Sequence, residues 1–103
     1  MLIGKETCKL AVETFGEESQ TRMAVEEMGE LLTALNHYRR GRCTIEAVQE
    51  EIADVLICAE QLACIYGYEE TARKMDAKML RLEDRIKHYN ENETDNSNRQ
   101  ATL

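Results

Sequence analysis

The 103-residue sequence contains no proline and only five glycines, so it is poor in the residues that end helices and form turns. A sheet protein usually shows more turn residues and more β-branched runs, and this scarcity therefore favours helices. With 43% hydrophobic and 32% charged residues, the composition fits a helical bundle. A chain of this length forms one domain that buries only a modest fraction of its surface alone, so we expect it to associate with copies of itself.

Other absences exclude classes of partner. No run of about 18 apolar residues is present, so we expect no membrane-spanning helix. The net charge is -7, whereas proteins that bind nucleic acid backbones are normally basic, so we expect no nucleic acid partner. The first six residues become charged at once and are not typical of a signal peptide. The four cysteines form no CxxC pair, and we interpret them as reduced thiols in a cytoplasmic protein.

Apolar residues recur at helical spacing in four segments of the chain. We expect helices over residues 6–15 and about 21–40, a third that Thr44 caps and Gly67 ends, and a fourth over about 69–89. The sequence after residue 90 has almost no apolar side chains, so we expect a helical domain over 1–90 and a disordered polar tail over 91–103. The predicted fold class is therefore all-α, a four-helix bundle with oligomeric packing.

Two clusters of carboxylates lie on the second and third expected helices. Each places three acidic side chains within about one helical turn, and their members are Glu26, Glu27 and Glu30, then Glu50, Glu51 and Asp54. Like charges at this spacing repel and destabilise a helix. Because apolar residues surround Glu27 and Glu51 on their own helical faces, we expect both at the rim of the buried stripe. Antiparallel packing of the two helices would bring the clusters toward each other.

Facing carboxylates in a partly dry groove repel one another and lose hydration, which favours a cation between them. Neither cluster contains a Lys or Arg that would neutralise it. Mg²⁺ takes oxygen ligands and usually keeps waters and substrate phosphates in its shell, while the lack of a nearby His argues against Zn²⁺. One EExxE motif alone is more often a solvated helix face, but two clusters on adjoining helices favour a metal site.

The two motifs also carry a resemblance to a known family. The pattern Glu27-x-x-Glu30 followed by Glu51-x-x-Asp54, on adjacent helices of an all-α chain, resembles the MazG-like nucleoside triphosphate pyrophosphohydrolases. The resemblance extends over residues 15–85. It implies a four-helix MazG-like fold and Mg²⁺-dependent cleavage of a (d)NTP between its α- and β-phosphates, which releases (d)NMP and pyrophosphate.

The resemblance further implies roles for particular residues. The implied ligands of Mg²⁺, with Mn²⁺ as an alternative ion, are Glu27, Glu30, Glu51 and Asp54. Either Glu26 or Glu50 is a candidate to orient or deprotonate the attacking water, or each is simply solvated. The fourth helix carries a basic stripe made up of Lys74, Lys78, Arg81 and Arg85. It is either a solvated face or a set of phosphate contacts, for which Lys78 and Arg81 are the candidates.

Two residues of the segment before the first cluster have alternative interpretations. Gln20 carries donors and acceptors suited to a base or sugar, so it is a candidate for substrate binding, or it solvates a helix start. Phe15, the single phenylalanine, either stacks on a base or fills the core, and we expect the core.

Alternative functions stay open at this point. A non-catalytic helical interaction protein would use its acidic face to dock a basic partner. A related all-α pyrophosphatase would act on dUTP or phosphoribosyl-ATP. A di-iron protein is disfavoured because neither cluster contains the Glu-x-x-His pair of that class. For the enzyme we expect a nucleoside triphosphate as the substrate and a homodimer or homotetramer as the assembly.

Overall fold

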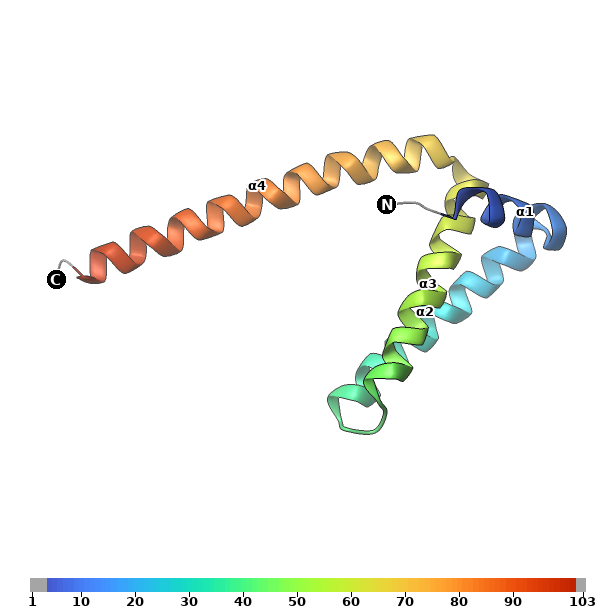
Figure 1. The fold of residues 1–103 in the computed structure, drawn as a ribbon, viewed down its shortest axis with the longest axis horizontal. Coiled ribbons are helices and arrows are strands. Elements are labelled where there is room, and N and C mark those ends of the chain that lie inside the picture. The colour runs from blue at the N-terminus through green and yellow to red at the C-terminus, as the bar shows by residue number, and fades with distance from the viewer. Residues whose placement is uncertain (1–3, 102–103) are drawn as a thin grey trace. The chain divides into compact units, whose positions relative to one another are not determined.

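The computed structural model describes the backbone of residues 4–101 and the side chains of residues 4–96. The helices are α1 (Lys5–Phe15), α2 (Glu17–Arg39), α3 (Ile45–Tyr66) and α4 (Tyr68–Ala101) (Figure 1). Within residues 4–101 there is no strand, which confirms the all-α class. The chain divides after Tyr68 into two compact units, the first containing α1, α2 and α3 and the second the remainder of α4.

The structure differs from the expected division into a domain of residues 1–90 and a disordered tail of residues 91–103. Instead, α4 continues without interruption from Tyr68 to Ala101. No proline or glycine follows Gly67, so no residue in this stretch forces the helix to end. The Thr94 hydroxyl also donates to the Asn90 carbonyl at 2.9 Å, one turn back along the same helix. Residues 102–103 of the expected tail lie outside the described part of the chain.

Single glycines set the boundaries between helices. Gly16 has φ +94° and ψ 150°, a conformation open essentially to glycine alone, and it is the one residue between α1 and α2. The second helix therefore begins at Glu17, before the expected start at residue 21. Gly67 has φ +119° and its N–H donates to the Ala63 carbonyl at 2.9 Å, which closes α3 where the sequence predicted. The predicted cap at Thr44 is also present, since its hydroxyl accepts the Ala47 N–H at 3.2 Å.

In the first unit, α2 and α3 pack along each other and α1 packs against both. A short loop joins α2 to α3, so the two helices run antiparallel, as the sequence predicted (Figure 1). The packing residues are small: the buried apolar side chains of the described range are Cys8, Ala24, Cys58 and Ala63. Small side chains let the helix backbones approach closely.

A buried carboxylate fastens α1 to α3. Glu60 is 7% exposed, and its Oε2 accepts the Gly4 N–H at 2.7 Å, at the start of α1. The carboxylate therefore satisfies a backbone donor that has no partner inside the helix, and its charge is favourable at a helix N-terminus. The Cys8 thiol donates to the same oxygen at 3.5 Å. Burial, followed by the interaction with Glu60, raises the pKa of Cys8 to about 11.

Large apolar side chains are poorly covered by a single copy of the chain. Leu32 on α2 and Leu56 on α3 are 63% and 62% exposed, and no large side chain among those described is fully buried. All four cysteines are free thiols. Every helix within residues 4–101 is too short or too polar to cross a bilayer.

Candidate metal centre

The structure brings carboxylates from both predicted clusters together across the α2–α3 interface. Glu27 on α2 and both Glu51 and Asp54 on α3 each offer a carboxylate oxygen, and these oxygens lie within 4.8 Å of one another. Asp54 is one turn beyond Glu51 on α3, so a single face of that helix supplies two of the three groups. Glu30, the fourth predicted ligand, is not among these grouped carboxylates, although its charge acts on both Glu27 and Glu51. We call these four residues the acidic cluster.

Two oxygens of the acidic cluster are enclosed without a partner. Glu27 and Glu51 are half-buried, while Glu30 and Asp54 are exposed. The Oε2 atoms of Glu27 and Glu51 are inaccessible to solvent and have no hydrogen-bond partner. A buried acceptor that lacks a donor costs free energy, and a charged one costs more. These oxygens therefore have unused capacity to bind a cation or a donor.

Desolvation and mutual repulsion raise the pKa of both half-buried carboxyls. Loss of hydration is the largest cause of the raised pKa of Glu27, followed by the charges of Glu30, Asp54 and Glu51. The raised pKa of Glu51 has desolvation as its largest cause too, with the charges of Glu30 and Asp54 next. No basic side chain is among the main causes of either shift, and the cluster itself contains no counter-charge.

This donor set fits a hard divalent cation. All of its donors are carboxylate oxygens, and they come from two helices whose packing holds them close together. Mg²⁺ and Mn²⁺ prefer oxygen ligands of this kind, and a cation would remove both the repulsion and the unpaired acceptors. Neither a histidine nor a thiol belongs to the set, so it lacks the nitrogen and sulfur ligands typical of Zn²⁺ sites.

A hollow of about 650 Å³ opens beside the acidic cluster. Its size suits a small-molecule ligand. The residues that line it, from α2, α3 and the loop between them, are Glu26, Gly29, Glu30, Thr33, Ala34, His37, Cys43, Ala47 and Glu51. Thr33 and His37 had not been singled out as site residues from the sequence. The signal was present, because they follow Glu30 by three and seven residues and so share its helical face.

The two candidates for the water-activating carboxylate have different surroundings. Glu26 is exposed and lines the hollow together with Glu30 and Glu51. Glu50 is also exposed but does not line it, and its charge contributes to the raised pKa of Glu51 less than desolvation or the charges of Glu30 and Asp54 do. The geometry therefore separates two residues that the sequence left equivalent.

The burial of Gln20 and Phe15 is the reverse of what their polarity suggests. Gln20 is only 3% exposed, so its amide is not presented to a ligand in solvent. Phe15 is 64% exposed and lines a second hollow at the α1–α2 junction, together with Glu26. The expectation that Phe15 fills the core is wrong for this unit, because Gly16 ends α1 directly after it and leaves the ring at the surface.

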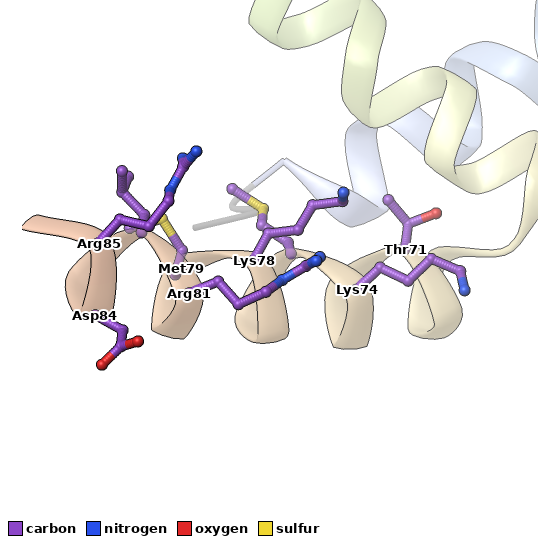
Figure 2. Close-up of a pocket in the computed structure, with 9 residues that line it drawn as sticks. Thr71, Lys74, Lys78, Met79, Arg81, Asp84 and Arg85 are labelled. Carbon is purple, nitrogen blue, oxygen red and sulfur yellow. The ribbon is translucent and has the colours of Figure 1, made fainter. Parts of the chain in front are cut away.

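The candidates for phosphate binding on α4 are exposed cations. Lys74, Lys78, Arg81 and Arg85 follow one side of the helix, along a hollow that they line with Met75, Met79 and Leu82 (Figure 2). None of the four forms an ion pair with a residue of the described part of the chain; the neighbouring Arg73 pairs with Glu70 instead. These cations are therefore available to an anion or to another protein surface.

Comparisons with known proteins add no further information. The chain matches no family model, and neither the curated proteins nor the solved structures give a match.

Proposed function

We propose that this chain is a Mg²⁺-dependent nucleoside triphosphate pyrophosphohydrolase of the MazG-like type, which cleaves a (d)NTP into (d)NMP and pyrophosphate. One observation supports this most directly. Glu27, Glu51 and Asp54 come from two helices, their oxygens lie within 4.8 Å of one another, and Glu27 and Glu51 each retain an enclosed oxygen with no partner.

In this proposal the acidic cluster is the metal site. Glu27, Glu51 and Asp54, with Glu30 beside them, would hold Mg²⁺ or Mn²⁺. When bound, such an ion neutralises charge on phosphate oxygens and lowers the pKa of a coordinated water. Without a cation the cluster would repel a triphosphate, so the activity should depend strictly on added divalent ions.

The protein's own groups then position the water and the substrate. Glu26 lines the same hollow as Glu30 and Glu51, so we assign it, rather than Glu50, to accept a proton from the attacking water. Thr33 and His37 offer hydrogen-bonding groups in that hollow to the sugar or base. Lys78 and Arg81 are proposed as phosphate contacts from their charge. Gln20 would have to leave its buried position before it contacted a nucleotide.

We also propose that the working form is a homodimer or homotetramer in the cytoplasm. The exposed leucines of α2 and α3 support association, because one copy leaves apolar surface of a kind that oligomer interfaces cover. The free thiols support a reducing location.

A panel of nucleotides tests the activity. Purified protein is incubated with NTPs, dNTPs, dUTP and phosphoribosyl-ATP in the presence of Mg²⁺ or Mn²⁺, and the products are separated by chromatography. We expect a nucleoside monophosphate together with pyrophosphate. Turnover of dUTP or phosphoribosyl-ATP alone would identify one of the related pyrophosphatases, whereas orthophosphate release or no turnover of any substrate would contradict the proposal.

A pair of variants on α3 makes the test specific to the acidic cluster. Glu51→Gln removes one enclosed carboxylate and should abolish turnover. Glu46→Gln removes a charge from the exposed first turn of the same helix and should leave turnover unchanged. A non-catalytic docking protein would show no turnover in any form and would bind its basic partner less well as charges were removed.

A further inference from the structure

The second unit consists of one helix whose apolar side chains are uncovered within that unit. Met79, Leu82, Ile86 and Tyr89 are 42%, 40%, 52% and 66% exposed. A single helix cannot bury its own stripe, so a stripe of this length needs a partner.

The spacing of the stripe is that of a coiled-coil seam. Its members recur at intervals of three and four residues, which assigns them to alternating a and d positions of a heptad. In order along α4 they are Ala72, Met75, Met79, Leu82, Ile86 and Tyr89. Ile86 falls at an a position and Leu82 at a d position, the combination that favours two parallel strands.

The charges beside the seam are sorted by sign. The e positions, which directly follow d, carry Asp76 and Glu83, whereas the g positions, which directly precede a, carry Lys78 and Arg85. In a parallel pair a g residue meets the e residue five positions later on the other strand, so Lys78 faces Glu83 of the second copy. In an antiparallel pair g faces g and e faces e, which would oppose like charges along both sides.

We propose that α4 pairs with α4 of a second copy of this chain as a parallel, two-stranded coiled coil. The seam is apolar, its flanks are complementary only in the parallel orientation, and the cations of the g flank have no ion-pair partner within the described residues. Lys78 and Arg85 of this flank extend from α4 (Figure 2). This contact goes beyond the proposed enzymatic activity and does not depend on it.

In the coiled coil, different residues of the basic stripe have different roles. Lys78 lies at g, so it belongs to the interhelical pair. Lys74 and Arg81 lie at c, on the outer side of the seam, and stay accessible to an anion. Of the two phosphate contacts proposed above, the coiled coil therefore retains Arg81 and assigns Lys78 to assembly.

Two leucines that lie two residues apart provide a matched test in the full-length chain. Leu82 is in the seam at d, and Leu80 is at b, on the outer side, and 67% exposed. Leu82→Ser should raise the dissociation constant for self-association by roughly tenfold or more, because both copies lose a buried leucine. Leu80→Ser should leave it unchanged. Sedimentation equilibrium measures the mass and far-ultraviolet circular dichroism checks the helix content.

Several outcomes would overturn the proposal. Equal effects of the two substitutions would show that the seam has no special role. A lower Tm for Leu82→Ser with an unchanged dissociation constant would show that the stripe does not contribute to self-association. If the wild-type protein stayed monomeric at high concentration, α4 would not pair with a second copy and the proposal would be wrong.

Charge exchange tests the orientation. Lys78→Glu or Glu83→Lys alone should weaken association a few-fold in a parallel pair, since each opposes like charges, and the double variant should restore it. In an antiparallel pair with Lys78 opposite Arg85 of the second copy, Lys78→Glu would instead create an attraction and strengthen association. Failure of the double variant to restore the wild-type dissociation constant would overturn the parallel arrangement.

Discussion

Glu27 and Glu51 face each other across the α2–α3 interface, and the Oε2 atom of each is enclosed without a hydrogen-bond partner. Their carboxyl pKa values are both raised, with desolvation as the largest cause. Close packing of α2 against α3 at these two residues therefore costs free energy unless a cation is bound.

The first prediction concerns the pH dependence of folding without divalent ions. A raised pKa means that the folded protein holds protons that the unfolded chain has released, so the free energy of unfolding falls as the pH rises. The loss should occur between the ordinary glutamate pKa of 4.5 and the raised values of the folded state. Urea unfolding in a chelating buffer at several pH values measures it. The double variant Glu27→Gln/Glu51→Gln should lose most of this slope, and an unchanged slope would show that other groups cause it.

The second prediction concerns added metal. Mg²⁺ should raise the Tm of the wild-type protein in proportion to the logarithm of its concentration once the site is filled, because an ion that binds only the folded state stabilises it by mass action. Glu51→Gln should abolish this rise, and Glu46→Gln should retain it. Calorimetry across a Mg²⁺ titration checks both. A rise of equal size in all three proteins would indicate non-specific screening of negative charge.

The third prediction compares two glycines. At Gly4 an added Cβ would lie 2.6 Å from the Glu60 Oε2, whereas at Gly29 it would meet nothing within 4 Å. Gly4→Ala should therefore displace the carboxylate and lower the free energy of unfolding by about 1–3 kcal/mol, the cost of unsatisfied buried groups. Gly29→Ala, in the middle of α2, should raise it by roughly 0.5–1 kcal/mol. Denaturant unfolding distinguishes the two, and a loss of stability in both would contradict the assigned surroundings.

The fourth prediction separates the two outer carboxylates. Glu26→Gln should lower kcat by about 10²–10⁴-fold with little change in KM, since Glu26 lines the hollow and would act on the water. Glu50→Gln should leave kcat within several-fold of the wild type. Steady-state kinetics with the best substrate of the nucleotide panel measures both. A larger loss for Glu50→Gln would reverse the assignment.

Much of the fold followed from local signals. Apolar periodicity located all four helices, and Thr44 and Gly67 marked real boundaries because capping and positive φ are decided by a few neighbouring residues. The helix over residues 91–101 was not expected, because polar composition favours disorder, although no residue there interrupts a helix. The convergence of Glu27 with Glu51 and Asp54 was predictable because antiparallel pairing constrains the register of two facing helices.

The surroundings of individual side chains were harder to predict. Burial of Gln20 and exposure of Phe15 depend on the angle between α1 and α2 at Gly16. The polarity of neither residue determines that angle. The anchoring of Gly4 by Glu60 joins positions 56 residues apart, and no local pattern indicates such a contact. The hollow with Thr33 and His37 likewise depends on how closely α3 approaches α2.

The small core contains two buried thiols whose reactivity reports local unfolding. Cys8 and Cys58 are among its few buried apolar side chains, and burial is the largest cause of the raised pKa of each thiol. Since the thiolate is the reactive form, both should resist alkylation while folded and react quickly once exposed. A pulse of iodoacetamide followed by mass spectrometry would therefore time local opening at the α1–α3 contact without any engineered label.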